Sequence, residues 1–215
     1  KRNTVVLDAG SVRDLQQKLG ELLNVARAEM ENLYEQIAGS GYAVILSDAD
    51  AVVLSAVTDP NVKREFRSAG LWLGAVWSEQ NEGTNGLGTA IAERCPVTVH
   101  CGEHFRHYNV GLSCCGAPIL DVNGDVLAVL DASAANSADT RQVQRHTMAL
   151  VNMSANLISR CHFLSQFQDD WILRFHGRAE FVGLLHEALV AVDDNGRIMA
   201  VNESALMQLG INSRD

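Results

Sequence analysis

Basic residues and long apolar runs are both scarce in this sequence. Lys and Arg number 17 against 26 Asp and Glu, which gives a formal net charge of -9 at pH 7. Because phosphate contacts need a clustered Lys and Arg surface, this composition argues against direct binding of DNA or RNA. No apolar stretch approaches the roughly 20 residues that span a bilayer, and no signal-like start is present. We therefore expect a cytoplasmic protein that makes no contact with a membrane.

Cysteine is sparse as well, with five residues and no pair at CxxC spacing. An odd number without paired spacings fits reduced thiols better than a disulfide framework. The 215 residues, of which 47% are hydrophobic, can bury one full domain and part of another. Because the chain starts at Lys1 and stops in a polar tail, we expect it to be a piece of a longer protein.

A periodic apolar pattern predicts a long helix near the N-terminus. Apolar residues recur every three or four positions over residues 12–37, with charged residues between them. Ser11 is placed to cap this helix, and Gly39 and Gly41 are placed to end it. We expect this first segment, residues 1–40, to pack on the next domain or to dimerise the chain.

The next segment is typical of a single antiparallel sheet. Four runs rich in β-branched residues form two hairpins: YAVILSD with AVVLSAV, and LSCCGAPIL with DVLAVLDAS. The second hairpin turns at Asp121, Asn123 and Gly124, and PVTVH adds a strand. A short helix is expected over residues 61–70. Residues 41–136 are therefore predicted to form the core domain of an α+β protein.

The segment after the sheet, residues 137–178, is predicted to be one long helix that continues to about Phe175. Five apolar residues in it follow the seven-residue spacing of coiled coils: Val143, Leu150, Leu157, Leu164 and Trp171. We expect this helix to leave the domain and to pair with another chain.

The last segment, residues 179–215, is too short to bury a core of its own. It shows a helical stretch, then a hairpin that turns at Asp194, Asn195 and Gly196, and then a short helix. This pattern predicts the start of a second domain.

The glycine-rich stretch NEGTNGLGTAIAE, residues 81–93, opens onto a helix and so invites comparison with phosphate-binding loops. No lysine follows Gly88, so the phosphates of a nucleotide would lack their charge partner. Ile91 stands where a dinucleotide fingerprint has its third glycine. Two alternatives remain: a structural turn capped by Thr84 or Asn85, and a capped helix start that lines a small-molecule pocket.

Histidines and cysteines crowd between residues 100 and 115 without the spacing of a metal site. Cys114 and Cys115 follow each other on a predicted strand, so their side chains point to opposite faces and could not hold one ion. No metal, other cofactor or catalytic residue is predicted. The adjacent thiols are candidates for a redox sensor, a role that needs an accessible thiolate of low pKa.

The run from Trp77 to Ser133 resembles the GAF domain of sigma-54-dependent bacterial transcriptional activators, above all the group that controls acetoin catabolism. The matching stretches are WSEQNEGTNGLGTAIAERCPVTVHCGEHF and LSCCGAPILDVNGDVLAVLDAS. The sequence departs from that group at Gly116, where related chains often carry Ala or Ser, and we expect the change to alter the volume of a pocket. The tail EALVAVDDNGRIMAVNESALMQLG is similar to the start of a PAS domain.

The resemblance implies a GAF-like central antiparallel sheet flanked by helices, with long N- and C-terminal helices and the beginning of a PAS-like domain. It implies a non-catalytic sensor that binds a small metabolite of the acetoin, diol, alcohol or ketone class. The sensor would form a homodimer through its terminal helices. The signal would pass to an AAA+ ATPase and a DNA-binding module that this sequence lacks, and only those parts would contact sigma-54 RNA polymerase and DNA.

We predict that the ligand lies between the sheet and the segment from Trp77 to Thr89. The candidate ligand-binding residues are Trp77, Glu82, Thr84, Asn85, Thr89, His104, Phe105, Cys115 and Asp131. The candidate redox residues are Cys114 and Cys115. A redox sensor in the same regulatory context, an enzyme such as a metal-dependent hydrolase that uses the histidine cluster, and a dimerisation unit without a ligand remain alternatives.

Overall fold

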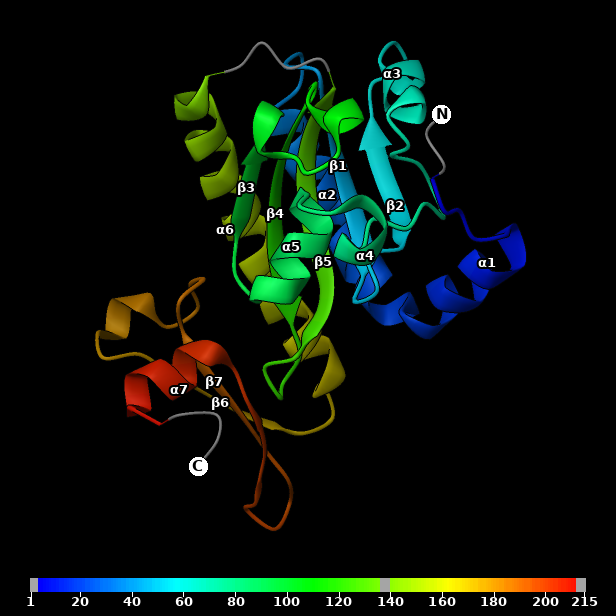
Figure 1. The fold of residues 1–215 in the computed structure, drawn as a ribbon. Helices are drawn as coiled ribbons and strands as arrows, with labels where there is room; N and C mark the ends of the chain where they lie inside the picture. Colours follow the sequence, from blue (N-terminus) through cyan, green and yellow to red (C-terminus); the bar gives the residue numbers. More distant parts are fainter. Residues whose placement is uncertain (1–3, 136–139, 212–215) are drawn as a thin grey trace.

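The computed structural model describes residues 4–135 and 140–211. It shows an α+β protein with one large antiparallel sheet, helices on both faces of that sheet, and a smaller three-stranded sheet (Figure 1). The α+β architecture predicted from the sequence is confirmed.

The large sheet has the strand order β2-β1-β5-β4-β3, and every neighbouring pair is antiparallel. Its strands are β1 (Tyr42–Asp48), β2 (Val53–Thr58), β3 (Val97–His100), β4 (Leu112–Leu120) and β5 (Val126–Ala135). The two hairpins and the added strand are therefore where the sequence predicts them. β5 lies at the centre, between β1 and β4.

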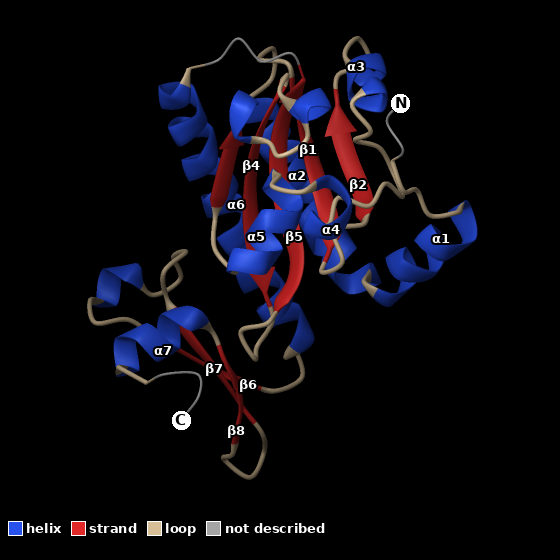
Figure 2. Cartoon of the chain, viewed as in Figure 1, coloured by secondary structure: helices blue, strands red, loops and turns tan. Residues whose placement is uncertain are grey.

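Helices cover the two faces of this sheet (Figure 2). On one face lie α2 (Gly20–Gln36) and α6 (Arg141–Gln166). On the other lie α3 (Lys63–Ser68), α4 (Glu79–Glu82) and α5 (Gly86–Glu93). Two short 3-10 turns, Cys101–Glu103 and His107–Asn109, connect β3 to β4 beside α4.

The period-two alternation of β5 divides its side chains between the two helical layers. Leu130 and Ala132 point to the core under α2 and α6. Val129 points to the core under α5. Asp131 and Ser133 alternate in the same way, so both point to the face that α5 covers, where they are fully buried.

The N-terminal helix is broken in two, contrary to the single helix predicted. α1 spans Ala9–Lys18 and α2 starts at Gly20. The break falls beside a glycine, which is a poor residue for a helix interior. The predicted cap, Ser11, is wrong as well: the Asp8 carboxylate caps α1, accepting from the backbone amides of Gly10 at 2.8 Å and Ser11 at 3.0 Å.

The prediction of a helix as far as Phe175 is also wrong. α6 ends at Gln166, and residues Trp171–Phe175 form strand β6. Trp171 therefore is not part of a helical seven-residue repeat, because it pairs with Val192 in a sheet. The buried residues of α6 from Gln144 to Ile158 are mostly three or four positions apart, which is the pattern of a helix lying on a sheet.

Strand β6 belongs to the small second unit. Its sheet has the order β6-β7-β8, with β7 at Ala188–Val192 and β8 at Ile198–Val201, and α7 (Glu203–Leu209) follows. The predicted hairpin and last helix are confirmed. The helical stretch expected before β7 is only a 3-10 turn, Ala179–Phe181.

Two kinds of contact join the second unit to α6. Phe163 of α6 packs among Leu189, Ala191 and Ala200 of the small sheet. The fully buried carboxylate of Glu187 accepts from Arg160 of α6 at 2.5 Å and from Arg174 of β6 at 2.6 Å.

None of the helices within the described ranges is both long enough and apolar enough to span a bilayer.

Candidate ligand site

The glycine-rich motif is a rigid turn capped by Asn85. The Asn85 Oδ1 atom accepts from the amides of Leu87 at 3.0 Å and Gly88 at 2.9 Å, and Nδ2 donates to the carbonyl oxygens of Trp77 at 2.9 Å and Gly83 at 2.7 Å. Asn85 is fully buried, and its amide group is saturated by these bonds. The capped helix start predicted at Gly86 is therefore present, and its cap is a structural one.

Thr84 and Thr89 flank this turn. The Thr89 hydroxyl accepts from the Asn85 backbone amide at 3.1 Å and donates to the Glu79 carboxylate at 2.5 Å. Thr84 is half-buried, and its carbonyl oxygen accepts from the Phe105 amide at 3.4 Å. Ligand contact by Thr84, Asn85 and Thr89 stays a prediction, and the structure uses these residues first to hold the turn together.

Trp77 is a core residue in this fold. Its side chain is 1% exposed, it packs among Phe66, Leu71 and Leu87, and its Nε1 donates to the Gly70 carbonyl oxygen at 2.8 Å. A buried indole whose N–H group is hydrogen-bonded fills the core beneath the motif and has a structural role.

Two glycines let the start of α5 lie directly on the sheet. A Cβ atom at Gly86 would lie 2.5 Å from Asp131 Oδ1 and 2.6 Å from Cys114 Cβ, and one at Gly116 would overlap the Gly86 carbonyl oxygen. The missing side chain of Gly116 therefore makes room for the backbone of α5.

Beneath α5, four polar side chains form a continuous chain of contacts, which we call the Asp131 cluster. The cluster contains His104, Cys114, Ser133 and Asp131, all of them buried. His104 Nε2 lies 3.4 Å from Cys114 Sγ, Ser133 Oγ lies 3.1 Å from Cys114 Sγ, and Ser133 donates to Asp131 Oδ2 at 2.5 Å. Two residues predicted for the site, His104 and Asp131, thus belong to one buried group.

The protonation of His104 follows from its partners. Its Nδ1 lies 3.0 Å from the Cys101 carbonyl oxygen, which can only accept, so Nδ1 carries the proton. Burial lowers the pKa of His104, which keeps the ring neutral at pH 7. Nε2 is then an acceptor, and the Cys114 thiol is the donor to it.

Asp131 is the member of the cluster with a shifted pKa and incomplete hydrogen bonding. Burial raises its pKa to about 7, against the opposing effects of the Ser133 hydroxyl and the Cys115 backbone amide. Its Oδ1 atom is buried and has no hydrogen-bond partner among the described residues. A buried oxygen without a donor destabilises the folded state by about 1–3 kcal/mol. Such unpaired oxygens are rare in the interior of folded proteins.

A second buried polar pair lies at the start of the glycine-rich motif, where Glu82 directly precedes Gly83. Asn109 Nδ2 donates to Glu82 Oε2 at 3.1 Å, and both side chains are almost completely buried. The Asn109 Oδ1 atom has no partner among the described residues. Glu82 was predicted for the site, whereas Asn109 and Ser133 were not. Asn109 lies outside the matching stretches, and Ser133 ends one of them without any local pattern that marks it as part of a site.

Phe105 connects the pair to the cluster, since it follows His104 and its ring packs over Gly83. Gly83 has a φ of 68°, and its missing side chain provides the space that the ring occupies. Phe105 itself is 70% exposed, so much of its ring faces the solvent.

Cys115 is not brought together with the other predicted residues. It points to the opposite face of the sheet, where its thiol donates to Gln144 Oε1 of α6 at 3.3 Å. Burial raises the pKa of Cys115 to about 12 and also raises the pKa of Cys114 well above its ordinary value. Both thiols are therefore protonated at neutral pH.

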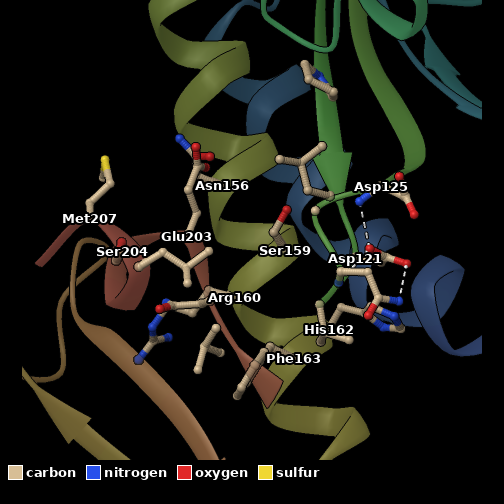
Figure 3. A pocket seen from close by; sticks show the side chains of 18 of the residues that line it. Asp121, Asp125, Asn156, Ser159, Arg160, His162, Phe163, Glu203, Ser204 and Met207 are labelled. Atoms are coloured by element: carbon tan, nitrogen blue, oxygen red, sulfur yellow. Dashed lines mark hydrogen bonds between the residues drawn. The ribbon is translucent and has the colours of Figure 1, made fainter. Parts of the chain in front are cut away.

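A cavity of about 730 Å³ lies elsewhere, at the junction with the second unit (Figure 3). Figure 3 shows Asn156 of α6 close to Glu203 at the start of α7, whereas His162 of α6 lies on the other side of the cavity, near Asp121. A groove of about 540 Å³ borders α3 and the start of β4. None of the predicted site residues lines either space. Within the described part of the chain, no three His, Cys, Asp or Glu side chains are arranged to hold a metal ion.

Comparisons with known proteins agree with the fold and identify relatives. Residues 6–155 match the family described as MimR, N-terminal domain. The chain is 36% identical over 204 residues to the Acetoin catabolism regulatory protein of Cupriavidus necator. This match covers 95% of this chain and 30% of that protein. It is 30% identical over 200 residues to the Signal-transduction and transcriptional-control protein of Clostridium beijerinckii, with 93% and 31% covered.

The fold is shared with a solved structure, that of the E. coli DhaR(N)-DhaL complex. The TM-score is 0.67 at 17% identity, and the match covers 99% of this chain and 73% of that chain. The chain spans 30% and 31% of the length of the two curated relatives, whose names are those of regulatory proteins rather than enzymes. The sequence match over residues 6–155 shows that this chain belongs to the family of the MimR N-terminal domain.

Proposed function

We propose that this chain is the ligand-sensing regulatory region of a cytoplasmic bacterial transcriptional activator. The ligand is a small metabolite of the acetoin, diol, alcohol or ketone class. The chain acts as a homodimer through its terminal helices and relays binding to an AAA+ ATPase and a DNA-binding module, which contact sigma-54 RNA polymerase and DNA.

The Asp131 cluster carries this proposal. A buried carboxyl group with an unpartnered oxygen destabilises the fold, and such groups are found where function requires them. The cluster lies under the motif that resembles the sensor family, and burial raises the pKa of its one thiol, Cys114, so the cluster offers no activated thiolate nucleophile. Binding without catalysis is the role that fits this chemistry.

Strand β4 supports the relay. Cys114 belongs to the cluster on one face of the sheet, and its neighbour Cys115 contacts Gln144 of α6 on the other. Gln144 also donates to the Tyr42 hydroxyl at 2.6 Å, so the first turn of α6 is joined to two strands by buried hydrogen bonds. A ligand that shifts β4 would therefore change the contacts of α6, which is the differential interaction that coupling requires.

The test is calorimetric titration of the purified chain with butane-2,3-diol, acetoin and butan-2-one. We expect saturable heat with at least one compound. Ser133→Ala, which removes the donor to Asp131, should weaken binding, whereas Ser159→Ala in the junction cavity should not. The absence of heat with all three compounds, in a sample that is folded by circular dichroism, would count against the proposal.

The redox alternative is not favoured by the geometry. A thiol that senses peroxide reacts as an accessible thiolate, whereas Cys114 and Cys115 are buried and protonated.

A further inference from the structure

Each side-chain donor of the Asp131 cluster already has an acceptor, either inside the cluster or in the backbone beside it. The Nδ1 proton of His104 goes to the Cys101 carbonyl oxygen, and the Cys114 thiol proton goes to His104 Nε2. The single proton of the Ser133 hydroxyl goes to Asp131 Oδ2. No donor in the cluster is left for Asp131 Oδ1, which explains why this atom has no partner.

The neighbouring pair has the same deficit. Asn109 Nδ2 faces the Glu82 carboxylate, which fixes the orientation of the amide, because a flipped amide would place Oδ1 against a carboxylate oxygen. Asn109 Oδ1 is then a buried acceptor without a donor. When Asp131 is ionised, as it is above its pKa of about 7, the unfilled hydrogen-bonding capacity of both groups is therefore acceptor capacity.

We propose that the ligand of this site is recognised as a hydrogen-bond donor, through one or more hydroxyl groups, so that diols and hydroxyketones bind and ketones without a hydroxyl do not. This inference rests on the proposed ligand-sensing function and narrows its ligand class. A donor to Asp131 Oδ1 removes the energetic cost of an unpaired buried oxygen, whereas a carbonyl group places a second acceptor against it.

The position of α5 gives the binding step a mechanical consequence. Because Gly86 lies directly over Asp131 Oδ1, a hydroxyl group reaches that atom only if the start of α5 moves away from the sheet. The hydroxyl group then occupies the space between α5 and Asp131, so ligand binding is coupled to a displacement of the start of α5.

The experiment compares ligands that differ in hydroxyl content: butane-2,3-diol with two, acetoin with one, and butan-2-one with none. The methyl ether of acetoin, 3-methoxybutan-2-one, keeps the oxygen and blocks the donor. Titrations at pH 8 keep Asp131 ionised. We expect the diol and acetoin to bind about tenfold or more tightly than the two compounds without a donor. Equal or tighter binding of butan-2-one and the ether would overturn the inference and leave the proposed function standing.

A variant gives a second, independent measurement. Asp131→Asn exchanges one acceptor for a donor in the same shape, so the ratio of diol to butan-2-one affinity should fall towards one. Asp170→Asn, at an exposed carboxylate after α6, is the matched control and should keep the wild-type ratio. If Asp131→Asn does not fold, the titrations of the wild type with the four compounds decide alone. If none of the four compounds binds the wild type, the proposed ligand-sensing function is refuted, which is a different result from equal binding of compounds with and without a hydroxyl donor.

Discussion

At the scale of single residues, the fold depends on positions where a side chain is missing. Gly86 and Gly116 meet backbone to backbone between α5 and β4, and a Cβ atom on either would collide with its neighbour. Neither glycine has a positive φ, so the requirement is for space and not for backbone conformation.

We expect Gly116→Ala to destabilise the chain by about 1–3 kcal/mol, the usual range for an overpacked site. Urea unfolding, followed by circular dichroism, measures the change. Gly102→Ala is the control, because its Cβ would meet nothing within 4 Å, and it should change stability by less than about 0.5 kcal/mol. Equal stability of Gly116→Ala and the wild type would show that α5 does not lie on the sheet in this way.

Asp131 should give the stability of the chain a specific dependence on pH. Its pKa is raised from 3.8 to about 7 on folding, so the folded state holds this proton more tightly than the unfolded state does. The resulting stabilisation is complete below pH 3.8, declines as the pH rises and is gone above pH 7; it amounts to about 4 kcal/mol. Asp131→Asn should remove this decline, leaving a variant more stable than the wild type at pH 8.

Two histidines titrate in the same range with the opposite sign. Burial lowers the pKa of His104 and His162, so each contributes stability that is present above pH 6.5 and is lost as the pH falls. The measurement is therefore the difference between wild type and Asp131→Asn at each pH, in which these contributions largely cancel. A difference that does not vary between pH 5 and pH 8 would contradict the assignment.

At the scale of elements, the ion pairs that link α6 to the small sheet can be tested directly by mutation. Glu187 is the shared acceptor of Arg160 and Arg174, and these ion pairs lower its pKa to about 2 in spite of its burial. The stabilisation from this carboxylate is thus present above pH 4.5 and is lost as the pH falls towards 2.

We expect Glu187→Gln to lower the free energy of unfolding of the second unit by about 1.5–3 kcal/mol, which is the usual contribution of hydrogen bonds to charged groups. Hydrogen exchange of the amides in β6 and β7 should accelerate, while that of β1 and β5 should not. Glu180→Gln, a nearby exposed carboxylate, is the control. Uniform acceleration across both sheets would mean that the two units unfold together.

The elements also show where sequence reasoning succeeds and where it stops. The strands of the large sheet were predictable because β-branched runs separated by Asp, Asn and Gly turns identify hairpins locally. The ends of the helices were not. The apolar period of α1 continues through Leu19 into α2, and the period of α6 continues to Trp171, so the pattern alone hides both breaks.

The buried polar group could be anticipated only in part, for a related reason. Asp131, His104 and Glu82 were named through the resemblance of their motifs, and their contact with a ligand stays a prediction. Cys115 was assigned to the same site, although the alternation of a strand gives it to the other face. Strand register places Ser133 beside Cys114, and the fold of the connection between β3 and β4 places Asn109 beside Glu82. Both are long-range properties that the local sequence does not contain.

At the scale of the whole molecule, the remaining prediction is the homodimer. The face of α6 away from the sheet carries Met153 at 56% exposed, between the partly buried Leu150 and Leu157. Light scattering after gel filtration should give a dimer mass for the wild type. Met153→Glu should shift the mass towards the monomer, and Met207→Glu on α7 should not. A monomeric wild type at all concentrations would remove the dimer from the proposal.

The adjacent cysteines of β4 have a practical consequence. Each keeps its proton and gives it to a different acceptor, Cys114 to a histidine ring and Cys115 to an amide oxygen of α6. The infrared stretch of an S–H bond falls in a spectral window that other protein groups leave empty, and its frequency follows the acceptor. One peptide unit therefore holds two natural vibrational probes, one for the site and one for the helix.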